Sequence, residues 1–245
     1  MTLHMMKKRL LALAAVMALG SGSALAQKAG DVQIGAGWLH FAPQDSSGPL
    51  IFTAPRPAVV PGSGASVDKS DTLGLNAIYF IDSHWAVEGV IGVPPKWRLQ
   101  GTGTLAPIGE LGTARQWSPT VLAKYYFNDG EARFRPYLGL GATYVWYSNV
   151  NLTPGLQGAL ANRIGAPVLG TSTTAKVDSS FSAVFNVGAA YQFDTHWGVS
   201  FSVSYIPLKT KANLTTAVLG VPLAASEASL KVDPIVPYLA LTYKF

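Results

Sequence analysis

The chain has 245 residues, of which 49% are hydrophobic and only 13% are charged, and it contains no cysteine. The mean hydropathy is +0.25, yet only the N-terminal segment approaches the run of about 20 apolar residues that a membrane helix needs. Disordered chains are excluded too, because they are poor in aromatic residues and rich in charge. What remains is an all-β chain with more apolar residues than a soluble protein carries.

The first residues are organised as a secretory signal peptide. The basic residues Lys7 to Arg9 precede the apolar run 10–19, and an Ala-x-Ala sequence that ends at Ala26 predicts cleavage after that residue. The alternative, a membrane anchor, is disfavoured because the apolar run is too short to span a bilayer. We therefore expect a signal peptide over 1–26 and a single mature domain over 27–245.

The mature sequence has 15 Lys and Arg residues against 13 Asp and Glu residues, a formal charge of +2, because the signal contains three basic residues and no acidic one. No run of basic residues remains, so a nucleic-acid partner has no support. The lack of cysteine is compatible with export to an oxidising compartment.

Alternation of apolar and polar residues recurs in stretches of about 10–14 residues, which is typical of β-strands whose two faces differ. In the clearest stretch, 181–193, every odd position is apolar or aromatic. The sequence predicts eight strands, over 31–42, 71–81, 85–97, 115–127, 136–148, 180–193, 197–209 and 232–245.

The connections between these stretches alternate in length. Short turns follow the second, fourth and sixth stretches, at 82–84, from 128 onward and at 194–196. Long connections rich in Pro and Gly follow the first, third, fifth and seventh, at 43–70, 98–114, 149–179 and 210–231. An even number of strands with short turns at one end and long loops at the other indicates an outer-membrane β-barrel with short periplasmic turns and long extracellular loops.

The direction of the alternation separates a membrane barrel from a soluble one. A soluble barrel points its bulky apolar residues inward, whereas a membrane barrel points them toward lipid. In 197–205, aromatic and β-branched residues occupy one face, and only Gly and Ser occupy the other. Small polar side chains suit the crowded interior of eight strands, so the bulky face is predicted to face lipid.

Aromatic residues beside the short turns are predicted to form a girdle at the membrane interface. They are Trp85, Tyr125, Phe127 and Trp197. The last predicted strand ends with four apolar residues on one face, and this ending resembles the signal that the outer-membrane barrel assembly machinery recognises. Its residues are Leu239, Leu241, Tyr243 and Phe245.

Several short motifs, taken in their order and spacing, resemble the outer membrane protein W family, including its branch associated with alkane uptake. The resemblance covers essentially the whole mature chain. The motifs are Asn76 to Phe80 before an Asp-Ser-His-Trp turn, Gly92-Val93-Pro94, Ser118-Pro119-Thr120, Lys124 to Phe127, Phe134 to Gly141, Tyr205 to Thr210, Val232-Asp233-Pro234 and Thr242 to Phe245.

The resemblance implies a tall eight-stranded barrel with a hydrophobic channel that carries small apolar molecules through the lipopolysaccharide layer. It also implies release sideways through the wall into the bilayer, and an apolar gate in the lumen. Val90, on the inward face of its strand, matches one gate position, and Phe181 is the candidate for an aromatic one. No cofactor is implied.

Glu88 and Lys124 are the notable charged residues inside predicted strands, and both fall on the inward face at similar depth. A charge in a narrow lumen is tolerated when it is paired or hydrated. The pair is interpreted either as a polar plug or ion-selectivity element, or as a structural pair that fills the barrel floor. Either way it would block free solute flow and force apolar molecules out higher up.

Two turns share the pattern Asp-x-His-Trp, which places His84 and His196 in equivalent positions. A metal site between them is one interpretation, but Asp nucleates tight turns through its own backbone, so turn residues are favoured. The sequence has no Gly-x-Ser-x-Gly or His-Glu-x-x-His motif, and the lack of cysteine removes Cys-based chemistry. We expect no enzyme and no metal.

The long connections are apolar for extracellular segments, and contiguous apolar patches mark binding sites. They are interpreted as a funnel into the lumen or as a rigid cap, and one short helix is predicted from Leu156 to Ile164. The leading hypothesis is passive uptake of small hydrophobic molecules across the bacterial outer membrane, with lipid, lipopolysaccharide and the assembly machinery as partners. The alternative is a barrel without transport that serves as a surface receptor or adhesin; a water-filled ion channel is disfavoured by the narrow lumen.

Overall fold

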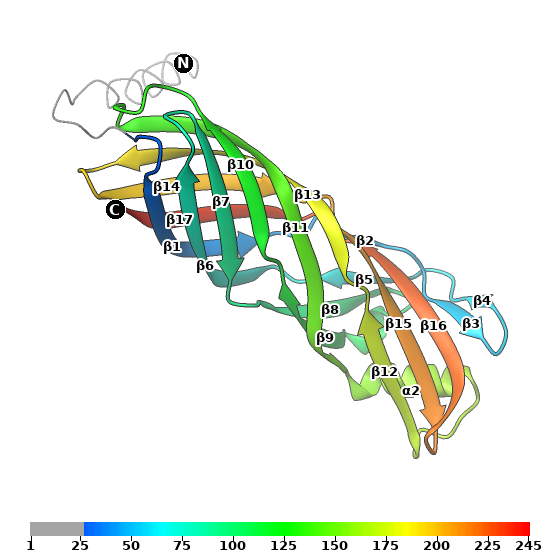
Figure 1. Ribbon diagram of the computed structural model, residues 1–245. Coiled ribbons are helices and arrows are strands. Elements are labelled where there is room, and N and C mark those ends of the chain that lie inside the picture. Colours follow the sequence, from blue (N-terminus) through cyan, green and yellow to red (C-terminus); the bar gives the residue numbers. More distant parts are fainter. Residues whose placement is uncertain (1–26) are drawn as a thin grey trace, which may run out of the picture.

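The computed structural model describes residues 27–245, so the predicted signal peptide lies outside the described residues. Eight antiparallel strands close into a barrel, as predicted (Figure 1). In order round the wall, they are β1 (Val32–Phe41), β6 (Ser70–Phe80), β7 (Trp85–Gly92), β10 (Thr120–Tyr126), β11 (Phe134–Leu152), β13 (Ser180–Gln192), β14 (Trp197–Tyr205) and β17 (Ile235–Lys244).

The barrel closes where β1 meets β17, with Gln33 opposite Lys244 and Leu39 opposite Tyr238. Closure leaves no strand edge with unpaired N–H and C=O groups, which is a requirement for a sheet that crosses a bilayer. Within residues 27–245, no helix is long and apolar enough to cross a membrane.

The long connections were expected to be loops, but they contain strands of their own. We call this part of the molecule the extension; it continues the barrel at the end opposite the short turns (Figure 1). One sheet adds β5 (Ser63–Val67), β8 (Lys96–Gly103) and β9 (Glu110–Trp117) to the far half of β11. The other contains β2 (Ser46–Ser47), β3 (Ile51–Ala54), β4 (Ala58–Val59), β12 (Thr171–Val177), β15 (Lys209–Val218) and β16 (Val221–Lys231).

Two helices complete the extension, the short 3-10 helix η2 (Ala106–Ile108) and α2 (Pro154–Arg163). Thr153 caps α2 by accepting a hydrogen bond from the N–H of Leu156, and a proline occupies its first turn, where a missing N–H costs nothing. The predicted helix is therefore present, beginning two residues earlier and ending one residue earlier than expected.

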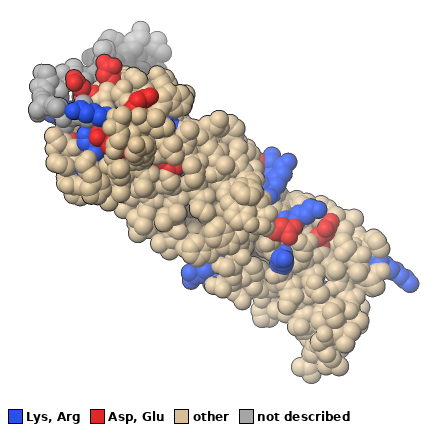
Figure 2. Space-filling model, viewed as in Figure 1, with Lys and Arg blue, Asp and Glu red and all other residues tan. Residues whose placement is uncertain are grey.

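Large apolar side chains dominate the outward face of the barrel strands. Outward residues such as Ile91, Leu140 and Leu241 are each more than half exposed, whereas Ile78 and Ala240 on the inward face are buried. Figure 2 shows charged residues near the short-turn end and again partway along the molecule, with a zone free of them between. This outward apolar zone matches the lipid-facing band of a membrane barrel.

Aspartate side chains build the short turns. Asp82 Oδ1 accepts hydrogen bonds from the N–H groups of His84 and Trp85, both at 2.7 Å. Asp194 repeats this arrangement with the N–H of His196 and of the residue after it. Among residues 27–245, no group of three or more metal-ligating side chains is placed to hold an ion.

The seam between β1 and β17 generates a prediction for Gly37. A Cβ atom at this position would meet the backbone carbonyl of Leu239, whereas a Cβ at Gly89 on the outward face would meet nothing within 4 Å. We expect Gly37→Ala to lower the free energy of unfolding by about 1–3 kcal/mol, the usual cost of overpacking, in urea titrations of protein folded into vesicles. Gly89→Ala is the matched control, and equal stability of both variants would contradict the close approach at the seam.

The aspartate turns generate a pH prediction. Their backbone hydrogen bonds lower the pKa of Asp82 and of Asp194 in the folded chain. The unfolded chain then binds more protons, so this contribution to stability is present above the ordinary carboxyl pKa of about 4 and is lost as the pH falls through the lowered pKa. We expect the free energy of unfolding to fall less steeply between pH 5 and pH 3 in an Asp82→Asn, Asp194→Asn double variant than in the unchanged protein. An equal slope in both proteins would contradict a contribution of the two aspartates to this pH dependence.

Candidate functional site

A buried ion pair lies in the lumen near the short-turn end, with Glu88 as the fourth residue of β7. Lys124 Nζ is 2.6 Å from Glu88 Oε2, and each side chain is only 3% exposed. The second carboxylate oxygen, Glu88 Oε1, accepts a hydrogen bond of 2.6 Å from Asn76 Nδ2. Tyr238 donates in turn to Asn76 Oδ1 at 3.1 Å. We call these four residues the charged layer.

The strand register brings the charged layer together. Leu122 lies opposite Glu88 in the β7–β10 ladder, which places Lys124 diagonally across from Glu88 on the same inward face. Lys124 Nζ also lies 4.1 Å from the centre of the Tyr137 ring, close enough for a cation–π interaction. With both charges compensated and hydrogen-bonded, the layer leaves no isolated buried charge in the lumen.

Below the charged layer, aromatic residues fill the short-turn end of the barrel. Phe80, Tyr126 and Tyr137 form a buried cluster. The ring centroid of Tyr126 lies 5.3 Å from that of Phe80 and 4.9 Å from that of Tyr137. Arg135 covers the Tyr126 ring and donates hydrogen bonds to the Gln27 side chain and to the carbonyl of Ser83. These side chains therefore occupy the interior of the barrel at this end.

Above the charged layer, a lumen cavity of about 60 Å³ opens between mostly apolar walls. Val90 lines this cavity and lies two residues above Glu88 on the inward face of β7. Leu39, Leu122 and Val236 contribute further buried apolar walls. Val90 is thus placed where a side chain can narrow an apolar passage.

Phe181 does not lie in the lumen, so its assignment as an aromatic gate is wrong. Its side chain is 78% exposed on the outward face of β13, and its ring lies 4.5 Å from that of Tyr144. The alternation of 181–193 puts Phe181 on the same face as Phe185 and Val187, which are also exposed outward. Phe181 therefore belongs to the lipid-facing surface.

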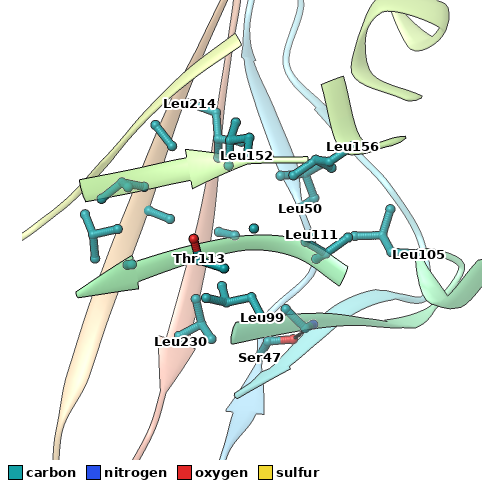
Figure 3. Close-up of a pocket in the computed structure, with 18 of the residues that line it drawn as sticks. Ser47, Leu50, Leu99, Leu105, Leu111, Thr113, Leu152, Leu156, Leu214 and Leu230 are labelled. Carbon is teal, nitrogen blue, oxygen red and sulfur yellow. Dashed lines mark hydrogen bonds between the residues drawn. The ribbon is translucent and has the colours of Figure 1, made fainter. Parts of the chain in front are cut away.

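The interior of the extension contains two further apolar hollows. The outer one, about 90 Å³, is surrounded by leucines that include Leu50, Leu111 and Leu214 (Figure 3). The inner one, about 50 Å³, lies between the outer hollow and the lumen cavity. It shares Leu99 and Leu230 with the outer hollow and Gln116 with the lumen cavity. The apolar residues of the long connections thus pack together as the cap interpretation expects, and they leave separate hollows between them.

The barrel wall is interrupted beside the lumen cavity. The ladder between β7 and β10 reaches Val90 opposite Thr120, and pairing resumes only at Lys96 opposite Arg115 in β8 and β9. The interval contains Pro94, Pro95 and Pro119, which have no N–H to donate. Val93, Pro95 and Ser118 from the interval line the lumen cavity.

The predicted interface residues all lie on the outward face. Trp85 and Tyr125 pack edge to face at 5.1 Å beside one short turn, with Phe127 next to them. At a second turn, Trp197 packs on Tyr243, which in turn contacts Phe245. Leu239 and Leu241 continue this surface along β17. The roles of these residues as girdle and assembly signal stay predictions.

Sequence analysis did not identify the partners of the ion pair or the interrupted wall. Asn76 and Tyr238 are polar side chains on inward faces, so the alternation carried a signal for them. Three prolines within two predicted strands were the signal for the interruption, because proline is excluded from the middle of a continuous sheet.

The charged layer generates a double-variant prediction. We expect Glu88→Gln to lower the free energy of unfolding by about 3–5 kcal/mol, because Lys124 would keep a buried charge without its counter-ion. The double variant Glu88→Gln, Lys124→Met should recover much of this loss, as measured by urea unfolding from vesicles. Additive losses would mean that the two residues do not interact.

The comparisons with known proteins agree with this architecture. The sequence model of the OmpW family matches residues 28–245. Outer membrane protein W of Escherichia coli is 30% identical, the match covering 98% of this chain and all of that protein. Outer membrane protein AlkL of Ectopseudomonas oleovorans is 27% identical over 76% of this chain and 71% of that protein.

The crystal structure of the outer membrane protein OprG from Pseudomonas aeruginosa superimposes with a TM-score of 0.76 at 28% identity, covering 91% of this chain and 99% of that one. The eight-stranded barrel and the location in the bacterial outer membrane are thereby confirmed. With a family match that extends over nearly all of the described residues, the chain belongs to the OmpW family of outer membrane proteins.

Proposed function

We propose that the protein gives small hydrophobic molecules passive passage from the extracellular side into the outer leaflet of the outer membrane. The observation that carries this proposal is a series of three hollows that runs from the extension to the charged layer. The two hollows of the extension have almost wholly apolar linings, whereas the lumen cavity adds polar groups such as Glu88 and Asn186 to its apolar walls. Apolar cavities such as the two in the extension stay dry and accept apolar guests, so they favour hydrocarbon over water and ions.

The hollows are separate, with volumes of about 90, 50 and 60 Å³. A molecule larger than a few heavy atoms therefore advances as the side chains between the hollows change rotamer. Aliphatic walls such as those of Leu99, Leu230 and Val90 permit this because no charge has to be desolvated. The same walls exclude water and ions by dewetting.

The charged layer ends the route toward the periplasm. An apolar molecule that reaches the lumen cavity meets Glu88, Lys124 and Asn76, whose hydrogen bonds it cannot replace. The packed aromatic residues below leave no path through the barrel axis. Release through the wall is then the remaining direction.

The interrupted wall supports a lateral exit. Between the Val90–Thr120 and Lys96–Arg115 pairs, an opening has few backbone hydrogen bonds to break because three prolines occupy the interval. Transfer of the guest from a narrow apolar cavity into lipid retains the favourable free energy of leaving water, about 0.8 kcal/mol per CH₂. No energy source is required, since the protein only lowers the barrier.

The test is the uptake rate of a long-chain alkane by cells that lack the protein and by cells that express it. We expect faster uptake with the protein present and no change in uptake of a charged solute of similar size. Equal alkane uptake in both strains would contradict transport and would favour the alternative, a receptor or adhesin barrel.

Val90 provides a test of the passage itself. We expect Val90→Arg to reduce alkane uptake about tenfold or more, because a long charged side chain in the lumen cavity adds both bulk and a hydrated group to an apolar passage. Val90→Ala is the control and should retain uptake. Both variants must reach the outer membrane in equal amounts, and unchanged uptake by Val90→Arg would remove Val90 from the route.

A further inference from the structure

Three basic side chains gather on the outer surface where the wall passes from barrel to extension. Lys96 lies directly opposite Arg115 in the β8–β9 ladder, and Arg98 follows two residues after Lys96 on the same outward face. All three are exposed. Lys96 and Arg98 belong to one strand and Arg115 to the next, so the strand register brings the three side chains together.

We call Lys96, Arg98 and Arg115 the basic cluster. Among residues 27–245, none of the three forms an ion pair. Asp68 lies beside Arg98, where its N–H donates to the Arg98 carbonyl, but its carboxylate accepts from the Gln100 side chain. Like charges directly opposite each other destabilise a sheet, so an external anion would relieve a cost that the fold leaves uncompensated.

The surroundings of the cluster define what kind of anion fits. Immediately toward the barrel lie the outward rings of Trp117 and Trp146, stacked in parallel at 5.8 Å, and Tyr144 continues the row. On the other side of Arg115 in the sheet lies Ser148, whose hydroxyl accepts from Trp117 Nε1. Along the outer surface, the basic groups are therefore followed by a hydroxyl and then by aromatic rings in the direction of the barrel.

The height of the cluster fits the outer surface of the membrane. From Trp85 beside the short turn to Val93, the outward positions of β7 and its continuation carry no charge, and nine residues of tilted strand are about one membrane span. Lys96 is the first charged residue beyond that span. The cluster thus lies at headgroup level, with exposed apolar side chains such as Val121 below it.

We propose that Lys96, Arg98 and Arg115 bind a phosphate group of a phosphorylated glycolipid of the outer leaflet, of the lipid A type, whose acyl chains lie along the aromatic row and the apolar wall below. Arginine pairs bidentately with phosphate, and lysine adds a point charge. The site borders the interrupted wall, between the Val90–Thr120 and Lys96–Arg115 pairs, so the bound lipid would lie beside that interval. Lipid binding here is independent of the transport proposal and is testable without it.

The experiment measures lipid retention by purified protein in detergent micelles, using native mass spectrometry with bisphosphorylated lipid A and with the same lipid after removal of its phosphates. We expect the phosphorylated form to bind at least about tenfold more tightly, and the triple variant Lys96→Gln, Arg98→Gln, Arg115→Gln to lose that preference. The matched control is Lys176→Gln, Lys209→Gln, Lys211→Gln, which removes the same charge from exposed positions in β12 and β15 and should keep the preference.

Three outcomes would overturn the proposal. The first is equal binding of both lipid forms, and the second is loss of the preference in the control variant as well. The third is full displacement of the lipid by inorganic phosphate at millimolar concentration, which would identify a general anion site rather than a lipid site. Circular dichroism melting curves check that both triple variants are folded, and single substitutions of Arg115 replace the triple variant if it is not.

Discussion

The structure depends on one constraint: every backbone N–H and C=O group in hydrocarbon must find its hydrogen-bond partner within the protein. Eight antiparallel strands satisfy it by closing between β1 and β17. Closure fixes two faces for every strand, and lipid outside requires that the bulky apolar face be the outer one. The inward face combines small and polar residues with buried apolar and aromatic ones, which together fill a narrow interior.

The interior then divides by depth. Near the short turns, aromatic rings and the Glu88–Lys124 pair fill the barrel, and higher up the walls become aliphatic and leave hollows. The extension continues this apolar interior beyond the wall, with Leu50, Leu111 and Leu214 inside it. The proposed route and its lateral exit follow from that division, because an apolar guest is accommodated above the charged layer and excluded below it.

The barrel could be predicted because membrane strands alternate strictly and aspartate turns such as Asp82 are local. The ion pair could be predicted as well, since inward parity and equal depth follow from the same alternation. The extension could not, because pairings such as that of β3 with β16 join residues about 175 positions apart and the strands are short. Phe181 was misplaced although its own alternation pointed it outward with Phe185. The wall interruption depends on prolines in two different strands, which become neighbours only after folding.

The most direct test of the inverted polarity is a single-cysteine spin-label scan along β14 in lipid vesicles, which is straightforward because the chain has no cysteine. Val199, Phe201 and Val203 alternate with Ser200 and Ser202, which are buried. Labels at the three apolar positions should collide often with oxygen dissolved in the lipid, and labels at the two serines rarely. An inverted pattern, or no alternation along the strand, would contradict a barrel whose apolar side chains face the bilayer.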